Sequence, residues 1–319
     1  MKKEDLRIVF MGTPEFAVGT LSALVEGGYN VVAVVTQLDK PVGRHGSVLR
    51  APAVKEYAQK HGIPVMQPEK MKDQDFVEQL RAYKADVQVV VAFRMLPEIV
   101  WAMPRFGTFN VHAALLPQYR GAAPINWAII NGETVTGVTT FFLDEDIDTG
   151  RIILQKKFDI PEDADVEFVY NGLMQLGANA ALETIDKMIA GDGEIKTRQQ
   201  DDFIEQGGEL KSAPKIFKDT CKIDWNMSAT DVHNFVRGLS PMPGAWGMVS
   251  LPNKRETEVK IYQTKKCSLD IENAEKPGTL VKINKKCYVA CGDYFLEILM
   301  IQPLGKKRMD AKSFLNGYL

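Results

Sequence analysis

The sequence predicts an α/β domain built on a parallel sheet, followed by a small all-β domain. The first half alternates short, wholly apolar segments with stretches of helical spacing, the pattern of a parallel sheet covered on both faces. From residue 245 onward, short alternating runs are separated by Pro, Gly and Asn, which is typical of a small barrel or sandwich. Residues 191–213 are polar and contain Gly, as linkers do. We therefore expect domains at residues 1–190 and 214–319, joined by this linker.

The elements of the first domain follow from these patterns in chain order. Continuous apolar runs predict buried strands at 6–11, 31–36, near Val65 and at 86–92, with further strands at 107–112, 135–143 and 152–158. Helical spacing predicts helices at 14–26, from about Ala51, near 73–83 and over 165–190. The polar, basic segment 37–50 shows neither helical nor strand periodicity of its apolar residues, so we expect a loop there.

The second domain begins with a helix expected near 228–238. Five short strands are then predicted at 245–251, 257–263, 278–283, 286–291 and 294–301. No internal repeat or low-complexity tract interrupts them, so the chain is expected to fold throughout both domains.

The composition is that of an ordinary globular protein. Of 319 residues, 45% are hydrophobic and 25% charged, which excludes collagen-like and disordered classes. No apolar run reaches 18 residues, and the first 16 residues resemble neither a signal nor a transit peptide, so no membrane partner is expected. All cysteines lie in the last third and none forms a CxxC pair, so a reducing, cytoplasmic location is expected.

Charge is divided unevenly along the chain. Residues 1–204 hold 21 Lys and Arg against 28 Asp and Glu, a net charge of −7, whereas residues 205–319 hold 18 against 13, a net charge of +5. The basic part includes Lys306, Lys307 and Arg308 in succession. Such a surface can bind a polyanion, although a solvated lysine-rich face would read the same way.

Several common motifs are missing. The sequence has no GxGxxG, GxxxxGK[ST] or GxSxG element, which removes the usual signatures of dinucleotide, P-loop and serine-hydrolase sites. The run 144–150 (DEDIDTG) places acids at alternate positions, but Thr149 and Gln155 stand where a calcium loop needs Gly and Glu. The four histidines have no zinc-ligand spacing, so no metal is expected.

The residues that could carry chemistry are Asn110, His112 and Asp148. Asn110 and His112 are two apart on a predicted strand, so they share a face near its carboxyl end, where open parallel sheets bind ligands. Asn can donate to a developing oxyanion, and His can donate or shuttle a proton. With no Ser or Cys nucleophile among them, they favour direct group transfer. The alternatives are a structural histidine and an aspartate that caps a turn.

Four longer segments give the sequence a specific resemblance. These are MGTPEFA (11–17), NVHAALLPQYRGAAPINWAIINGE (110–133), VTGVTTFFLDEDIDTG (135–150) and KIDWNMSATDVHNFVRGLSPMPGAW (222–246). They resemble the 10-formyltetrahydrofolate-dependent formyltransferase family, and the first and last resemble its methionyl-tRNA branch. The resemblance extends over essentially the whole chain.

The resemblance implies a Rossmann-like domain and an OB-like β-barrel. It implies transfer of a formyl group from 10-formyltetrahydrofolate to the α-amino group of methionyl initiator tRNA, through a tetrahedral intermediate and without a metal, in translation initiation. A cytoplasmic monomer is expected.

The resemblance also assigns roles to residues. Asn110, His112 and Asp148 match the catalytic trio. The folate-binding turn corresponds to Ala114, Leu115, Leu116 and Pro117. Segment 37–50 resembles the tRNA-reading insertion, with Arg44 at its functional arginine. From charge alone, we expect Lys40 and Arg50 of the same segment, and Lys306, Lys307 and Arg308 of the basic second domain, to bind tRNA as well.

Three positions depart from the family pattern. Ala114 replaces a serine in the turn, Phe93-Arg94 replace a frequent Tyr-Gly, and Asp146 replaces a glycine. Two other functions stay open from the sequence. One is formylation of a small amine such as an amino sugar nucleotide or a purine precursor. The other is a non-catalytic tRNA-binding protein.

Overall fold

The computed structural model describes residues 1–42, 48–204, 209–251, 255–267 and 275–318. The chain divides into two compact units. Unit 1 comprises Met1–Gly121, Thr136–Phe158 and Tyr170–Ser212, and unit 2 comprises Ala122–Val135, Asp159–Val169 and Ala213–Leu319. Two short segments of the first half therefore belong to the second unit.

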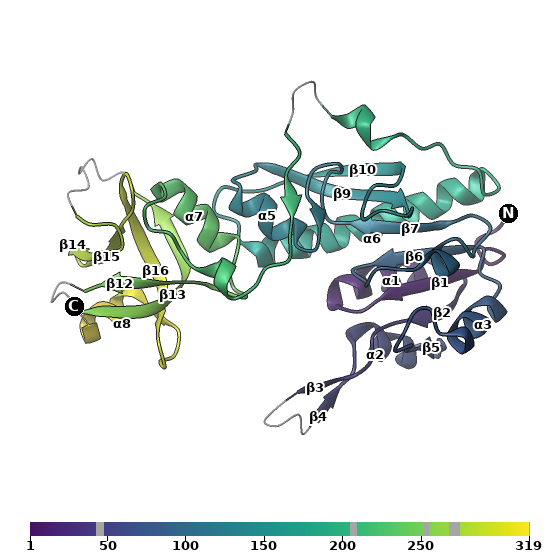
Figure 1. Cartoon of the computed structure of the whole chain (residues 1–319), viewed down its shortest axis with the longest axis horizontal. Coiled ribbons are helices and arrows are strands. Elements are labelled where there is room, and N and C mark those ends of the chain that lie inside the picture. Colours follow the sequence, from purple (N-terminus) through teal and green to yellow (C-terminus); the bar gives the residue numbers. More distant parts are fainter. Residues whose placement is uncertain (43–47, 205–208, 252–254, 268–274, 319) are drawn as a thin grey trace. The chain divides into compact units, whose positions relative to one another are not determined.

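A seven-stranded sheet forms the centre of unit 1 (Figure 1). Its strands follow the order β10–β9–β7–β6–β1–β2–β5. Their bounds are β1 Ile8–Gly12, β2 Val31–Val35, β5 Val65–Met66, β6 Val87–Val91, β7 Thr108–His112, β9 Val135–Phe142 and β10 Ile152–Asp159. The five strands from β7 to β5 are parallel, as predicted, whereas β9 runs antiparallel to β7. The sheet is therefore parallel at its centre with an antiparallel edge.

Helices cover both faces of this sheet. They are α1 Glu15–Glu26, α2 Ala53–Lys60, α3 Gln74–Ala82, α4 Glu98–Trp101 and α6 Val166–Ala190. Val9 and Met11 of β1 share a core cluster with Phe76 of α3. Ile8 and Phe10, which alternate with them, are fully buried as well. This burial on two faces explains why the strand reads as one continuous apolar run.

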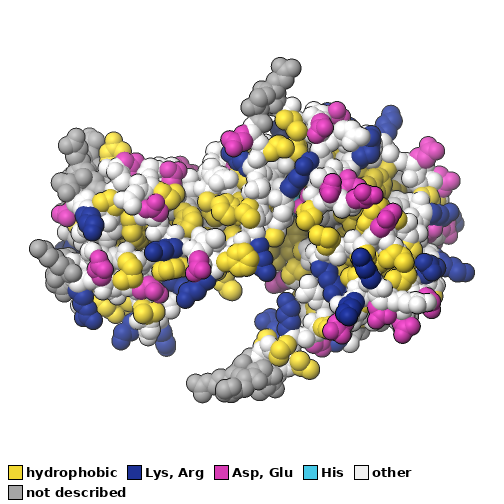
Figure 2. All heavy atoms as spheres, viewed as in Figure 1, with side chains coloured by type: hydrophobic (Ala, Val, Ile, Leu, Met, Phe, Trp, Pro, Cys, Tyr) yellow, Lys and Arg dark blue, Asp and Glu magenta, His cyan; other side chains and the backbone are white. Residues whose placement is uncertain are grey.

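The segment predicted as a loop at 37–50 contains a short two-stranded ribbon. Strands β3 (Lys40–Val42) and β4 (Val48–Arg50) pair antiparallel and are exposed throughout. The loop prediction was wrong at these residues, because strands exposed on both faces carry no apolar alternation. Residues 43–47, including Arg44, lie outside the described residues. Figure 2 shows hydrophobic side chains on this ribbon, with Lys and Arg side chains near its base.

The segment predicted as a linker also carries structure. It contains a 3-10 turn, η2, at Gln200–Phe203 and a short strand, β11, at Ser212–Ala213. Strand β11 pairs with β8 (Arg120–Gly121). Gln200 is buried. Part of this polar stretch is therefore fixed against unit 1 rather than free in solvent.

Unit 2 is built on an antiparallel sheet and short helices. The sheet order is β12–β13–β16–β15–β14, and β17 pairs with β16. The strands are β12 Ala245–Ser250, β13 Glu256–Lys266, β14 Leu280–Ile283, β15 Lys286–Ala290, β16 Phe295–Pro303 and β17 Met309–Asp310. The helices are α5 Pro124–Ile130, η3 Asp219–Cys221, α7 Ala229–Arg237 and α8 Ala311–Tyr318. The five strands predicted from the sequence are all present.

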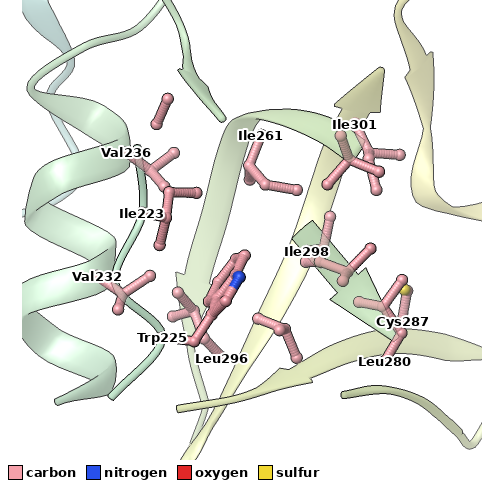
Figure 3. Close-up of a cluster of buried hydrophobic side chains, with 14 of the residues drawn as sticks. Ile223, Trp225, Val232, Val236, Ile261, Leu280, Cys287, Leu296, Ile298 and Ile301 are labelled. Atoms are coloured by element: carbon pink, nitrogen blue, oxygen red, sulfur yellow. The ribbon is translucent and has the colours of Figure 1, made fainter. Parts of the chain in front are cut away.

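The core of unit 2 lies between this sheet and α7 (Figure 3). Val232 and Val236 of α7 and Trp225 pack with Ile261 of β13 and Ile298 of β16. The indole of Trp225 donates its N–H to the Met248 carbonyl at 2.8 Å, which satisfies its one polar group inside an apolar cluster.

The sheet of unit 2 does not close into a continuous barrel within the described residues. Its outer strands, β12 and β14, meet only at an isolated parallel bridge between Ser250 and Thr279. There the Ser250 N–H donates to the Gly278 carbonyl at 2.9 Å. The barrel-or-sandwich expectation is therefore confirmed as an antiparallel sheet with a core, and not as a closed barrel.

Among the described residues, no helix is long and apolar enough to span a bilayer. None of the four cysteines forms a disulfide among the described residues. Burial raises the pKa of Cys287 and of Cys291 to about 12, so both stay protonated and act as small apolar core residues.

Candidate active site

Asn110 and His112 lie at the carboxyl end of β7. Because they are two residues apart, they project from the same face of the strand. His112 is 6% exposed, and its ring meets the Phe141 ring edge-on with centroids 6.4 Å apart. Asn110 is half-buried. The structure thus places both side chains at the sheet edge where the sequence analysis expected them.

The orientation of His112 is fixed by a backbone carbonyl. Its Nε2 lies 2.9 Å from the Tyr119 carbonyl oxygen, and its Nδ1 lies 3.8 Å from Oδ2 of Asp148. A carbonyl can only accept, so Nε2 carries a hydrogen in this arrangement. A neutral His112 therefore presents a bare Nδ1 toward Asp148, at a distance that is electrostatic contact rather than a direct hydrogen bond.

Asp148 is held in a left-handed backbone conformation, with φ of +57°. Asp and Asn are among the residues that tolerate this region best. Its Oδ2 accepts the Gly121 N–H at 3.0 Å, and its carboxylate is 13% exposed. Asp148 is therefore a turn residue that also lies beside His112.

Some buried polar atoms near this edge find no hydrogen-bond partner among the described residues. Asn110 Oδ1 is one, and the hydroxyls of Thr13 and Thr36, which follow β1 and β2, are two more. Unpaired buried polar atoms are rare in folded proteins and commonly meet water or a ligand. An N–H-bearing molecule bound at β7 would satisfy the Asn110 oxygen, so these residues fit a polar ligand.

The turn at 114–117, which is expected to bind folate, is held by hydrogen bonds to Thr139 of β9. The Thr139 hydroxyl accepts the Leu116 N–H at 3.0 Å and donates to the Ala114 carbonyl at 2.7 Å. Gln155 donates to the Leu116 carbonyl at 2.7 Å. Ala114, Leu116 and Pro117 are buried, while Leu115 is partly exposed. The Leu115 side chain packs against Gly137 of β9, where an added Cβ would lie 2.6 Å from Leu115 Cδ2.

Arg94, which departs from the family pattern, ties two loops together. Its guanidinium donates to the carbonyls of Pro68 and Glu69, which follow β5, while Arg94 itself follows β6. Burial lowers the pKa of Arg94 from its usual value. Phe93 lies beside the guanidinium, 5.8 Å from ring centroid to Cζ. The terminal nitrogens of the Arg94 guanidinium therefore donate to protein carbonyls.

The basic residues singled out in the sequence lie in different units. In unit 1, Lys40 and Arg50 form a cross-strand pair of the β3–β4 ribbon. In unit 2, the exposed Lys306, Lys307 and Arg308 lie between β16 and β17, and the Arg308 guanidinium lies 4.1 Å from the Tyr262 ring centroid. Figure 2 shows Lys and Arg side chains gathered along one edge of unit 2.

Sequence reasoning missed the residues that hold His112, Asp148 and the turn at 114–117 in place. Two of them act through the backbone, the Tyr119 carbonyl and the Gly121 N–H. The other two act through the Thr139 hydroxyl and the Gln155 side-chain amide, and no sequence motif marks any of these groups. The φ of +61° at Tyr119 reflects the tight loop that brings its carbonyl to His112. Within the described residues, no three His, Cys, Asp or Glu side chains are close enough to hold a metal ion.

Known protein families match both parts of this chain. The family described as "Formyl transferase" matches residues 6–185, and "Formyl transferase, C-terminal domain" matches residues 215–319. A protein named methionyl-tRNA formyltransferase from Parabacteroides distasonis is 56% identical over 320 residues, covering 100% of this chain and 97% of the relative. A protein of the same name from Flavobacterium johnsoniae is 46% identical, covering 98% and 96%.

Solved structures share the fold at low identity. HypX from Aquifex aeolicus, in complex with tetrahydrofolic acid, matches 97% of this chain with a TM-score of 0.63 and 19% identity, and this chain spans 47% of HypX. WlaRD, a sugar 3N-formyl transferase solved in the presence of dTDP and 5-N-formyl-THF, matches 95% of this chain and 99% of its own, with a TM-score of 0.62 and 20% identity. With relatives this similar over their full length, the chain belongs to the methionyl-tRNA formyltransferase family.

Proposed function

We propose that this chain transfers the formyl group of 10-formyltetrahydrofolate to the α-amino group of methionyl initiator tRNA, giving formylmethionyl-tRNA for translation initiation. The observation that carries the proposal is the grouping of His112 and Asp148, 3.8 Å apart, beside Asn110 at the carboxyl edge of the sheet. The co-substrate supplies an activated formyl carbon. An α-amino group has an ordinary pKa of about 7.7–8, so a useful fraction of it is the free amine near neutral pH, and the protein's main task is to stabilise charge on the formyl oxygen.

In this mechanism Asn110 and His112 bind that oxygen and the attacking amine. The Asn110 amide N–H donates to the formyl oxygen, while its unpartnered Oδ1 accepts from the amine. Since Nε2 of His112 is engaged by Tyr119, the proton must be taken up and given back at Nδ1. Each donor to the oxygen is worth about 10²–10³ in rate.

Asp148 balances the positive charge of a protonated His112. At 3.8 Å from Nδ1, its carboxylate stabilises the imidazolium electrostatically without occupying the Nδ1 hydrogen. The proton leaving the amine can then pass through Nδ1 to the departing folate nitrogen, a general acid–base step worth about 10²–10⁴ in rate. No step in this scheme requires a metal.

The turn at 114–117 is proposed as one wall of the folate pocket, with Leu115 as its one partly exposed residue. The buried residues Ala114, Leu116 and Pro117 form the turn. The Thr139 hydroxyl makes the hydrogen bonds to the Leu116 N–H and the Ala114 carbonyl that water would otherwise make. Because Ala114 has no hydroxyl, the turn depends on this internal support.

The tRNA contacts are proposed on both units. Lys40, Arg44 and Arg50 of segment 37–50 read the acceptor end, and Lys306, Lys307 and Arg308 bind phosphates. We further propose that residues 1–190 form the catalytic domain, 191–213 a linker and 214–319 a tRNA-binding domain. The isolated bridge between Ser250 and Thr279 supports an OB-like barrel for the last of these. The enzyme would act as a monomer in the cytoplasm.

A three-substrate assay tests the proposal. Purified protein is incubated with 10-formyltetrahydrofolate and, separately, methionyl initiator tRNA, glycinamide ribonucleotide or an amino sugar nucleotide. We expect formylation of the tRNA alone, abolished or strongly slowed in His112→Ala and Asn110→Ala, whose tRNA binding stays near that of the parent chain. Formylation of a small amine instead of the tRNA would show that the enzyme acts on small amines and would contradict the proposal. No formylation at all, with tRNA binding retained, would support a non-catalytic tRNA-binding protein.

A further inference from the structure

The carboxamide of Gln200 is the most completely engaged polar group near the candidate site. Gln200 is 3% exposed and lies in η2, within the segment that the sequence predicts as a linker. Its Nε2 donates to the Asp148 carbonyl at 2.7 Å and to the Gly150 carbonyl at 2.9 Å. Its Oε1 accepts from Arg120 Nε at 3.0 Å and from Nη2 at 2.7 Å. An amide has two hydrogens to donate and two lone pairs to accept with, so every one is used.

These four hydrogen bonds join the two loops that hold the catalytic pair. Arg120 lies between Tyr119, whose carbonyl orients His112, and Gly121, whose N–H binds the Asp148 carboxylate. Gln200 therefore bonds the loop of residues 119–121 through the Arg120 side chain, and the loop of residues 148–150 through the carbonyls of Asp148 and Gly150. Together with the Gly121 N–H, this bridge links the two loops that hold His112 and Asp148, and the two residues share no direct hydrogen bond.

The segment that carries Gln200 is itself anchored. Arg198 and Ile152, at the start of β10, exchange two backbone hydrogen bonds of 2.9 Å. Phe203 packs against the buried cluster of Leu116, Phe141 and Ile152. Gln200 thus projects from fixed backbone on both sides, as a residue that positions others must.

We propose that Gln200 is a positioning residue for formyl transfer, which fixes Asp148 against His112 through Arg120 and the 148–150 backbone. The inference rests on the proposed function for its kinetic consequences, but the geometry it describes can be measured without any reaction.

Gln200→Glu is the informative variant. A carboxylate of the same shape still accepts from Arg120 but has no hydrogens to donate, so the Asp148 and Gly150 carbonyls lose their partner. We expect kcat to fall about 10- to 100-fold, the effect of misplacing a catalytic group by a fraction of an ångström to an ångström. KM for both substrates should stay near wild type. Gln200→Met removes the same donors without a charge and should act alike, which covers the case in which Gln200→Glu folds poorly.

Two controls separate positioning from general destabilisation. Gln199→Glu makes the same change at the exposed neighbouring residue and should leave kcat unchanged. In a double-mutant cycle with Asp148→Asn, Gln200→Glu should cost little further activity, because it acts through Asp148. Additive losses, or equal losses in Gln199→Glu, would overturn the inference.

A readout independent of activity uses nitrogen NMR of the histidine rings. The chain has four histidines, so the His112 signals can be assigned with His112→Ala. We expect His112 as the Nε2–H tautomer, with ring signals that move in Gln200→Glu and not in Gln199→Glu. Unchanged His112 signals would refute the inference even if the protein formylates nothing. Moved signals in a protein without formyltransferase activity would instead count against the proposed function.

Discussion

At the scale of single residues, Asp148 combines an observed backbone role with a proposed catalytic one. Its carboxylate caps Gly121 and faces His112, while its backbone occupies the left-handed region. Asn tolerates that region and keeps an oxygen for the Gly121 N–H, so Asp148→Asn removes the charge and little else.

We expect Asp148→Asn to lower kcat by about 10²–10⁴-fold while its melting temperature stays close to wild type. Asp148→Ala should lose both activity and stability, because Ala disfavours a φ of +57° and leaves the Gly121 N–H without its acceptor. Steady-state kinetics and thermal melts on both variants check this. A fully active Asp148→Asn would reduce Asp148 to a turn residue.

Gly150 is a second residue fixed by its surroundings. A Cβ built on it would lie 1.7 Å from the Phe142 carbonyl oxygen and 3.4 Å from the Phe141 ring. Backbone, unlike a flexible side chain, cannot move aside cheaply, so Gly150→Ala should destabilise the protein by about 1–3 kcal/mol or more. Denaturant unfolding measures this. As a control, Gly62→Ala meets no atom within 4 Å and should show only the cost of its positive φ.

At the scale of elements, the β3–β4 ribbon is tied to unit 1 at its base. Asp39, which precedes β3, accepts from Gln67 at 2.8 Å and forms an ion pair with Lys55 of α2 at 2.8 Å. The hydrogen bond from Gln67, then that from Lys55, lowers the pKa of the Asp39 carboxyl. The ribbon therefore leaves the sheet edge in a set direction, although its strands have no buried face.

We predict that Asp39→Ala raises KM for tRNA with little change in kcat, because the ribbon would lose its orientation while the catalytic trio is untouched. Glu56→Ala removes an exposed carboxylate from the same helix as Lys55 and is the matched control. Kinetics at varied tRNA concentration test this. Equal KM values for the two variants would mean that the anchor does not serve tRNA recognition.

The environment of His233 makes unit 2 sensitive to acid. His233 is 2% exposed, and its Nδ1 lies 2.8 Å from the Thr264 hydroxyl. Burial, and secondarily the charge of Arg237, lowers its pKa below 6.5, whereas the nearby Asp163 opposes this. The charged groups around it are Glu162, Asp163, Arg237 and Lys266.

Because the unfolded chain binds this proton more readily, stability is full above the unfolded pKa and falls as the pH drops below it. We expect His233→Gln to show a smaller loss of melting temperature than wild type between about pH 7.5 and about pH 5.5. His61→Gln, at an exposed histidine, should behave as wild type. Identical pH profiles for the His233 and His61 variants would contradict the assignment.

At the scale of the whole molecule, charge is the property that divides the chain. The net charge of +5 over residues 205–319 contrasts with −7 over the rest. Binding through phosphates releases counterions, so affinity for tRNA should fall with salt by a logarithmic slope of about 0.7–0.9 for each neutralised phosphate.

Replacing Lys306, Lys307 and Arg308 with Ala should reduce that slope and raise KM for tRNA, while kcat at saturating tRNA is kept. The control replaces three exposed lysines of unit 1, Lys60, Lys70 and Lys72, and so removes the same charge. Binding titrations between about 50 and about 200 mM salt test this. Equal slopes for the two triple variants would make the basic run an ordinary solvated surface.

Sequence by itself determined the strands and helices with a clear apolar period, although it did not predict the short helices α4, α5 and α8. The apolar runs at 6–11, 31–36 and 86–92 became β1, β2 and β6 within one or two residues, and the helix expected over 165–190 became α6. It also placed Asn110 and His112 on one strand face, because a strand's period of two fixes which residues point together. Those features are local, and burial of one face makes apolar residues recur along the sequence at the period of the helix or strand.

Tertiary structure alone decided what local pattern does not record. The β3–β4 ribbon has no buried face, so its strands carry no alternation to detect. Asp148 and the turn at 114–117 are supported by hydrogen bonds between groups far apart in sequence: Gly121 with Asp148, Leu116 with Thr139, and Gln200 with Arg120. Their donors and acceptors include backbone amides and carbonyls that every residue possesses, so only the folded path of the chain selects which of them meet.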